Sequence, residues 1–412
     1  MAEGDEILAT GWGAQKPLSL LKERDFSLLL SGQLISALGD KINYIALGIL
    51  VFRATGSALA VGKMTIATLL PYLLFGLIAG VYVDRWDKKK TMIVSDVLRA
   101  CLVALIPWVI GVSINLVYVI TFLVTTVSLF FGPAKMAVIP TLFAREKIIA
   151  ATSLAETVEN VTEIAGYALA GVVAVIMTLD KVFYLDAATF VVSALTITLM
   201  QRGFGQETSR IGSAVWQDIK EGIAFIGQTK ALLVTLVSYC VVLLIFSGFN
   251  PLIFVYALHT LHTSSLGLGV LEAMHAVGIT VGGIVISVIG TPGGKGKWIT
   301  GGYLVSGATI AMLGLLYWYP LALVGFLFTG FSNAMFFMPI QAIFQELTPA
   351  NMRGRVFSAR FAVTRVAFMA SVAILTFAAN WVGVEKVYFV AGVTLTVVAL
   401  VTLSLKSLCT IA

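Results

Sequence analysis

Apolar stretches of about twenty residues recur along the whole chain, and this repeated length is what most constrains its fold. At the 1.5 Å rise per residue of an α-helix, about twenty residues cross the ~30 Å hydrocarbon core of a bilayer. The stretches are continuously apolar rather than alternating, which favours helices over a β-barrel. Only 12% of the residues are charged, whereas soluble proteins carry about 25%. The sequence therefore predicts an all-α membrane protein.

Twelve membrane-spanning helices are predicted, in two groups of six, with polar or glycine-rich breaks between them. The predicted spans are 26–52, 60–83, 91–112, 116–142, 150–177, 182–200, 231–258, 266–289, 299–317, 320–344, 357–379 and 384–405.

The chain divides into four predicted regions. The first 25 residues are polar and contain no apolar core of a signal peptide, so we expect no cleavable signal. Between the two groups of helices lies a polar segment whose residues 214–227 are amphipathic, which is typical of a helix lying at the membrane interface. The regions are a cytoplasmic tail (1–25), an N-terminal six-helix half (26–200), a cytoplasmic linker (201–230) and a C-terminal six-helix half (231–412).

Basic residues lie mostly on one side of the predicted membrane. With the N-terminus inside, 18 of the 27 Lys and Arg residues fall in inner loops and tails, and four fall in the outer loops or in the first turn of a span next to them. This asymmetry predicts that both termini are cytoplasmic. It also explains the net charge of +6 without nucleic acid as a partner. The three cysteines lie far apart, and the three histidines have no cysteine next to them, so we expect no disulfide framework, metal site or cofactor.

The second half of the chain repeats the first with an offset of 206 residues. The segment 131–153 aligns with 337–359, so that Pro133 falls on Pro339. Each segment ends one span, crosses a basic turn and enters the next span. Such parallel repeats are typical of transporters whose substrate site lies near the membrane midplane between the repeats.

A short charged turn joins the second and third predicted spans. Residues 80–92 read GVYVDRWDKKKTM, and this segment resembles the signature loop of major facilitator superfamily transporters. Residues 24–52, 131–143 and 184–195 resemble the exporter branch of that superfamily. That branch includes macrolide efflux proteins, siderophore exporters and the bacterial lysophospholipid transporter.

The resemblance implies a twelve-helix facilitator fold in a bacterial inner membrane and transport by alternating access. The first interpretation is an exporter of a hydrophobic or amphiphilic small molecule, coupled to the entry of a proton or cation. A lysophospholipid transporter remains open as the alternative, and a non-transporting receptor or scaffold is a third. We expect a monomer and no enzyme, because no catalytic constellation is present. One departure weakens the case for antiport, since Gly166-Tyr167 replaces the Gly-Pro step that superfamily antiporters often carry in the fifth helix.

Four residues of the charged turn are expected to form a conformational latch: Gly80, Asp84, Arg85 and Lys88. The resemblance implies that Asp84 faces a helix of the other half and holds one conformation shut. The alternative is a cluster of positive charge that only fixes topology. For the lysines we favour this alternative, and for Asp84 and Arg85 the latch.

Ionisable groups inside a bilayer are costly and therefore point to function. Asp40 lies deep in the first span and is the first candidate to bind a coupling proton or cation; its alternative role is a structural ion pair. Glu159 and Glu163 in the fifth span and Glu272 and His275 in the eighth form a second candidate cluster. By helical rise, Glu159 matches His275 in depth and Glu163 matches Glu272. The alternative for this cluster is a polar contact that keeps the outer gate shut.

The predicted substrate cavity is lined by Asp40, Asn43, Lys135, Glu156 and Arg365. Lys135 follows Pro133 and is expected either to extend to the interface or to engage an anionic head group or Glu156. Arg360 and Arg365 are five residues apart on the eleventh span, and at least one is expected to meet the second span or the cavity. Arg99 and Asp96, three apart, are expected to form a local structural pair.

Overall fold

The computed structural model describes residues 17–202, 215–292 and 294–404, and this part of the chain is helical with no β-strand. The fold class predicted from the sequence is therefore confirmed. The N-terminal half contains η1 (Pro17–Lys22), α2 (Arg24–Thr55), α3 (Ala58–Arg85), α4 (Lys88–Val109), α5 (Ile114–Leu142), α6 (Arg145–Ile176) and α7 (Leu179–Thr198). The C-terminal half contains α8 (Val215–Gln228), α9 (Lys230–Phe246), α10 (Phe249–Val255), η2 (Tyr256–Thr260), α11 (Ser265–Ile289), α12 (Lys295–Leu313), α13 (Tyr319–Leu347), α14 (Arg353–Val382) and α15 (Val384–Ser404).

Eleven segments of the described chain are long and apolar enough to cross a membrane, with α9, α10 and η2 counted as one. The remaining predicted span corresponds to α12, which has 19 residues and begins with Lys295 and Lys297. Although it is less apolar than the others, α12 packs between α13 and α15 inside the bundle. Each of the twelve predicted spans thus has a helix at its place in the chain.

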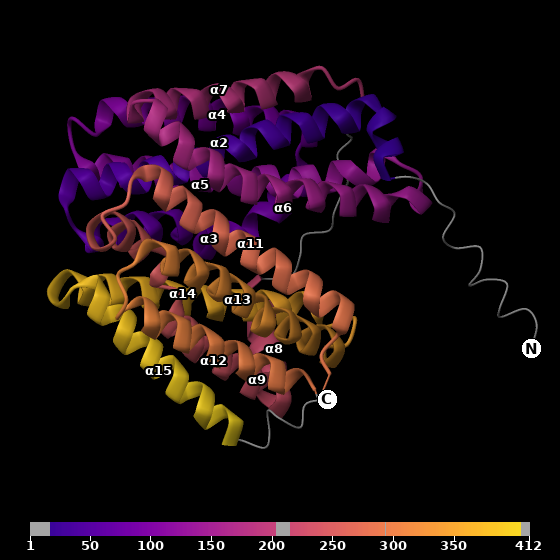
Figure 1. Ribbon diagram of the computed structural model, residues 1–412. Coiled ribbons are helices and arrows are strands. Elements are labelled where there is room, and N and C mark those ends of the chain that lie inside the picture. Colours follow the sequence, from indigo (N-terminus) through magenta and orange to yellow (C-terminus); the bar gives the residue numbers. More distant parts are fainter. Residues whose placement is uncertain (1–16, 203–214, 293, 405–412) are drawn as a thin grey trace, which may run out of the picture.

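Helix bounds in the two halves repeat with the offset of about 206 residues found in the sequence. α5 and α13 both have 29 residues and carry the equivalent prolines Pro133 and Pro339 inside the helix. In Figure 1 the N-terminal half forms the upper layer and the C-terminal half the lower one. The halves touch through two helix pairs, α6 with α11 and α3 with α14, and through contacts of α10 with α2 and α3.

The two ends of this bundle carry different elements and are named for them. The linker end is the end where α2, α4 and α6 begin and where α8 lies. The distal end carries the turns at 56–57, 177–178 and 261–264. Local sequence forms these distal turns: Gly56 adopts a left-handed backbone (φ 61°), and the Ser57 hydroxyl caps α3 by accepting from the Ala60 N–H at 3.4 Å.

Close packing at glycines joins the two halves at the distal end. A Cβ on Gly171 of α6 would lie 2.9 Å from the Leu266 carbonyl oxygen, and one on Gly269 of α11 would lie 2.6 Å from the Cα of Gly171. Gly48 faces the ring of Phe254 with no room for a side chain. Such small residues let helix backbones approach closely in a membrane.

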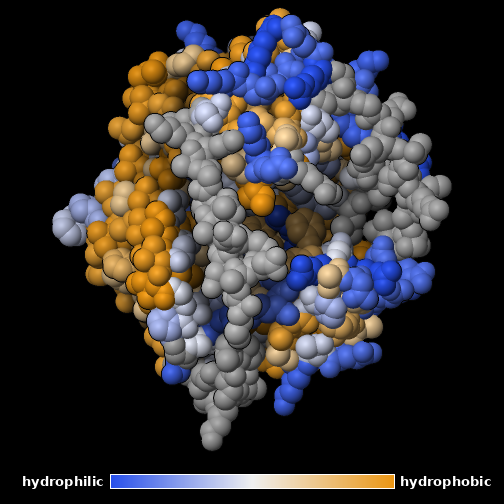
Figure 2. Space-filling model, turned by 90° about the vertical axis from the view of Figure 1, so that its right-hand side faces the viewer, coloured by the Kyte–Doolittle hydropathy of each residue, from blue (hydrophilic) through white to orange (hydrophobic). Residues whose placement is uncertain are grey.

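Toward the linker end the halves separate. Along the α3–α14 pair, Gly62 at the distal end packs against Thr376, whereas a Cβ on Gly76 would only just reach Phe361, at 3.9 Å. A Cβ on Gly80 would have no neighbour within 4 Å. In Figure 1, α6 and α11 diverge toward the right, and Figure 2 shows that end face on, with hydrophilic residues around a central hollow. The structure is therefore closed at the distal end and open at the linker end.

The described part of the linker region forms α8, which is tied to the C-terminal half. Arg355 of α14 pairs with Asp218 at 3.0 Å and with Glu221 at 2.7 Å. The backbone of Gly222 packs directly against the backbone of Arg355. These contacts fix the amphipathic helix predicted at 214–227 across the start of α14. Residues 1–16 and 203–214 of the predicted tail and linker lie outside the described residues.

The orientation of this bundle in the membrane can be tested with single cysteines. In a variant whose three native cysteines are serine, Lys220→Cys on exposed α8 is expected to resist a membrane-impermeant maleimide on intact cells, because the positive-inside rule predicts that α8 is cytoplasmic. Lys386→Cys, exposed near the distal end, serves as the matched external control and should react. Labelling of position 220 before permeabilisation would contradict the orientation.

Candidate functional site

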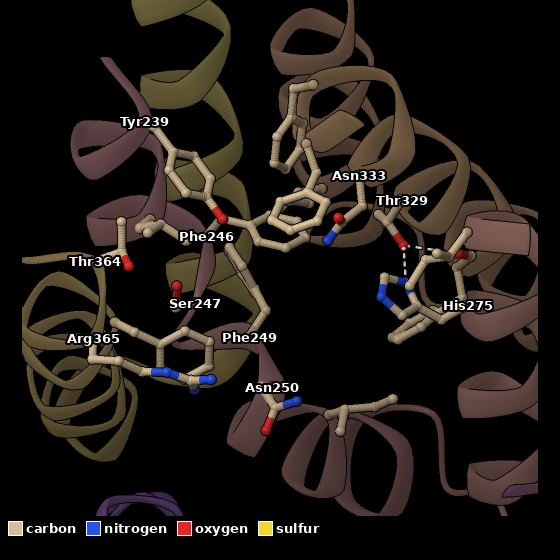
Figure 3. A pocket seen from close by; sticks show the side chains of 18 of the residues that line it. Tyr239, Phe246, Ser247, Phe249, Asn250, His275, Thr329, Asn333, Thr364 and Arg365 are labelled. Carbon is tan, nitrogen blue, oxygen red and sulfur yellow. Dashed lines mark hydrogen bonds between the residues drawn. The ribbon is translucent and has the colours of Figure 1, made fainter. Parts of the chain in front are cut away.

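A cavity of about 720 Å³ lies within the C-terminal half, lined by residues of α9 to α15. Its wall is mainly aromatic and aliphatic, including Phe246, Phe249, Phe336 and Phe361. Figure 3 shows Arg365 and Thr364 on one side of the cavity and His275 and Thr329 across from them. A cavity of this size with few polar groups suits a small molecule that carries a large apolar body.

The seventh span is interrupted where it meets this cavity. α9 ends at Phe246 and α10 begins at Phe249, and the Gly248 N–H donates to the Ser371 hydroxyl of α14 at 2.9 Å. A broken helix at this depth is tolerated where it lines a cavity. The break brings Ser247 and Asn250 to the cavity wall. The Tyr44 hydroxyl of α2 donates to the Asn250 side-chain oxygen at 2.9 Å, which links the broken helix to the N-terminal half.

Five basic residues that lie deep within the spans fall into two groups. In the N-terminal half, Lys41 pairs with Glu163 at 2.5 Å, and Lys135 and Arg99 each pair with a carboxylate. Arg360 and Arg365 of α14 line the cavity. Neither has a carboxylate partner among the described residues, and Arg360 Nη1 is buried without a hydrogen-bond partner. Insertion scales place the cost of a charge at the membrane centre at about 2.5–3.5 kcal/mol, so two unpaired guanidiniums need a functional reason.

A buried ionic cluster holds α2, α4 and α7 together in the N-terminal half. Asp186 is fully buried and accepts from the Asn43 amide at 2.6 Å. Asp96 and Arg99 form the predicted local pair. Asp40 is half-buried and lies within electrostatic range of Arg99 and Asp186. Three carboxyl groups, those of Asp40, Asp96 and Asp186, thus lie within electrostatic range of the Arg99 guanidinium.

Tyr72 of α3 lies between this cluster and the cavity. The Arg365 guanidinium carbon lies 5.4 Å from the centre of the Tyr72 ring. Tyr72 is also within electrostatic range of Asp40 and Arg99. The expectation that at least one of Arg360 and Arg365 meets the second span or the cavity is therefore confirmed, and Tyr72 links α3 of the N-terminal half to α14.

The predicted cluster between the fifth and eighth spans is only partly brought together. α6 packs against α11, and Glu272 lies within electrostatic range of Glu163 and Lys41. Glu159 instead pairs with Lys135, while the His275 ring shares a hydrogen bond of 3.2 Å with the Thr329 hydroxyl. The matched depths of Glu159 and His275 therefore do not produce a pair, because both groups are satisfied within their own halves.

The predicted substrate-cavity residues are divided between the halves. Among Asp40, Asn43, Lys135, Glu156 and Arg365, Arg365 lines the 720 Å³ cavity and the other four lie in the N-terminal half. The suggested pairing of Lys135 with Glu156 is wrong, because Lys135 reaches Glu159 one turn further along α6. Glu156 is exposed.

The predicted latch lies at the linker end of α3, where the halves are apart. The side chain of Asp84 lies outside the described part of the structure. Arg85 is exposed, Lys88 is buried, and Gly80 has no close neighbour. Lys89 donates to the carbonyl oxygens of Thr198 and Met200, at 3.0 and 2.6 Å, and so caps the end of α7 within its own half.

Three polar residues that the sequence interpretation did not single out belong to these sites. Asp186 stands in the segment YLDAATF, and its charge in the middle of an apolar span was the available signal. Ser247 and Asn250 lie in SGFNP, where a glycine and a proline inside one span indicate a broken helix.

Comparison with protein families and curated proteins agrees with this arrangement. The model of the Major Facilitator Superfamily matches residues 29–370 and 235–407. Macrolide efflux protein A of Streptococcus pyogenes is 23% identical over 382 residues, which cover 91% of this chain and 94% of the relative. The uncharacterized MFS-type transporter YfiS of Bacillus subtilis is 28% identical over 407 residues, with 94% of each chain covered. Multidrug efflux pump Tap of Mycolicibacterium fortuitum is 26% identical over 341 residues, covering 80% of this chain and 83% of the pump.

Among solved structures, the nucleoside transporter NupG superposes with a TM-score of 0.77 at 9% identity, covering 93% of this chain and 99% of that one. A bacterial homologue of the human lysosomal transporter Spinster superposes with a TM-score of 0.72 at 13% identity, covering 94% and 97%. At these identities the superpositions show a shared fold.

Proposed function

We propose that this chain, a secondary transporter that belongs to the Major Facilitator Superfamily, exports hydrophobic or amphiphilic small molecules by alternating access in exchange for a proton or cation. The observation that carries the proposal is the aromatic cavity of about 720 Å³ in a bundle whose halves are apart at the linker end. The similarity to a macrolide efflux protein and a multidrug efflux pump along most of the chain supports export of such solutes.

The direction of access follows from the proposed orientation. With both termini in the cytoplasm, the linker end faces inward, and this linker-open state receives substrate from the cytoplasm or the inner leaflet. Export then requires the linker end to close and the distal glycine contacts to part, which is a rocking of one half against the other. The latch at Gly80, Asp84, Arg85 and Lys88 is proposed to act in that second state, when α3 and α14 meet at the linker end.

Coupling is proposed to reside first at Asp40. Its cluster contains Asp96, Asp186 and Arg99, so protonation of one carboxyl group removes an excess negative charge from the bundle interior. Tyr72 gives the cluster a route to Arg365 in the cavity wall. The Glu163–Glu272 pair, at the contact of α6 with α11, is the second candidate.

Export is tested by flux measurements in proteoliposomes. The purified protein is offered a neutral macrolide, an amphiphilic acid, an amphiphilic amine and a lysophospholipid, with and without a pH gradient. We expect gradient-dependent accumulation of at least one of the three non-lipid compounds. Accumulation of the lysophospholipid alone would favour the lipid transporter instead, and gradient-independent leak of every compound would contradict coupled transport.

A further inference from the structure

Two guanidinium groups face the cavity from α14, the helix that forms one of its walls. The Arg360 guanidinium carbon lies 4.9 Å from the ring centre of Phe344 and 5.1 Å from that of Phe357. The Arg365 guanidinium carbon lies 4.9 Å from the ring centre of Phe361. Stacking on ring faces steadies a planar guanidinium and leaves the N–H groups at its edge free to bind a ligand.

Those N–H groups lack acceptors in the described structure. Within residues 17–202, 215–292 and 294–404, no carboxylate pairs with Arg360 or Arg365, and no hydrogen bond from either guanidinium is formed. Three further basic side chains lie deep within the spans, and each of them, Lys41, Arg99 and Lys135, is matched by a carboxylate. Among these five deep basic groups of the described residues, the two without a carboxylate partner are the two in the cavity wall.

The remaining charged and titratable groups of the cavity do not supply a counter-ion. Glu272 is 7% exposed, and its electrostatic partners are Lys41 and Glu163 at the contact with α6. The His275 ring is hydrogen-bonded to Thr329, across the cavity from Arg365. The cavity thus has a cationic wall on α14, aromatic side chains, and α11 residues that include the hydrogen-bonded His275 ring and the Glu272 carboxyl group.

We propose that the cavity recognises amphiphilic anions, with Arg360 and Arg365 binding the anionic group and the aromatic side chains holding the apolar body. Arginine suits this role because its N–H groups match the two oxygens of a carboxylate, sulfonate or phosphate. The inference rests on the proposed export function and restricts its substrates to anions. The anion can come from a soluble amphiphilic acid or from the head group of a lysophospholipid, and competition between the two separates these sources.

Binding is measured with a fluorescent acid, 11-(dansylamino)undecanoate, and its neutral methyl ester. The protein is held in nanodiscs of phosphatidylcholine, whose head group has no net charge. We expect wild-type protein to bind the acid at least about ten-fold more tightly than the ester, because a hydrogen-bonded ion pair is formed only with the acid. Arg360→Gln and Arg365→Gln should each bring acid and ester closer together. Arg365→Lys should retain part of the preference, since it keeps the charge and loses the planar fork.

Arg353→Gln is the matched control, because it removes an exposed guanidinium from the same helix outside the cavity. It should leave the preference for the acid unchanged. Thermal unfolding of each variant shows that it is folded, and Arg360→Lys replaces Arg360→Gln if the latter is not. Equal binding of acid and ester to wild-type protein, tighter binding of the corresponding dansyl amine, or a preference that survives in both folded arginine variants would overturn the inference.

Competition identifies the source of the anion. Displacement of the probe by lysophosphatidylglycerol, but not by lysophosphatidylcholine, would support the inference with a lipid anion as the ligand. Weaker displacement by both lipids than by undecanoate would support the inference with a soluble acid as the ligand.

Flux measurements separate the inference from export itself. Preferential binding of the acid without gradient-driven accumulation would contradict the export function and leave the anion site intact. Equal accumulation of acid and ester would overturn the charge preference and leave export intact.

Discussion

Leucine in place of Gly171 is expected to hold the distal end open and to lower transport at least about ten-fold, the factor that corresponds to roughly 1.4 kcal/mol. A Cβ at this position already meets the Leu266 carbonyl oxygen at 2.9 Å and the Cα of Gly269 at 3.1 Å. These are backbone atoms that cannot rotate away, so α6 and α11 must part at the distal end. Overpacking of this kind typically costs about 1–3 kcal/mol, and the cost falls only on the distally closed state. Spin labels at the exposed positions Ile176 and Trp381 should report a longer distance across the distal end.

Gly80→Leu is the matched variant at the linker end, where α3 and α14 are apart. No atom lies within 4 Å of a Cβ at Gly80, so leucine fits the present state and obstructs closure at the linker end. Its distal distances should therefore stay short while transport falls. Asp84→Asn should enrich the linker-open state and reduce turnover more than substrate binding, if Asp84 acts as the latch. Normal transport by Gly171→Leu, or identical distance shifts in the two glycine variants, would contradict alternating access at these contacts.

The fold could be predicted from the sequence because it follows from local features of each span and from the repeat of the first half in the second. Span length follows from bilayer thickness, and breaks follow from polar and glycine residues, so each predicted span matches a helix. The offset of 206 residues placed Pro133 and Pro339 at equivalent points of α5 and α13. Several helices, among them α4, α6, α12 and α14, begin three to five residues before their predicted spans, because the basic residues in their first turns read as loops.

The site was harder to predict because ion pairing depends on helix rotation, which span length does not determine. Depth alone matched Glu159 with His275, but α6 turns Glu159 toward Lys135 within its own half. Arg365 was identified from the sequence because a charged residue inside a span is rare and indicates function whichever way its helix is rotated. The break at Ser247-Gly248 was overlooked because the residues on both sides of it are apolar, so that the seventh span reads as one continuous hydrophobic segment.

Asp40→Asn is expected to abolish uphill transport while exchange of substrate across the membrane continues. The substitution keeps the size of the side chain and removes the carboxyl group that the proposed coupling requires. Asp40 lies within electrostatic range of Arg99, Asp186 and Lys41, so its charge interacts with groups on α4, α7 and α2. Without a titratable group at this position, rocking of the halves no longer carries a proton, and substrate only equilibrates. Proteoliposomes with an imposed pH gradient measure accumulation, and counterflow with substrate on both sides measures exchange.

Asp180→Asn provides the control, because Asp180 is an exposed carboxylate in the first turn of α7, away from the buried cluster. It should accumulate substrate normally. Asp186→Asn tests how far the role is shared: an asparagine there can still accept the hydrogen bond from Asn43, so loss of accumulation would reflect the lost proton site rather than lost packing. Accumulation by Asp40→Asn at the wild-type rate, with an unchanged pH dependence, would make Asp40 a structural residue. Coupling would then move to Glu163 and Glu272, because these two carboxylates lie within electrostatic range of each other where α6 packs against α11.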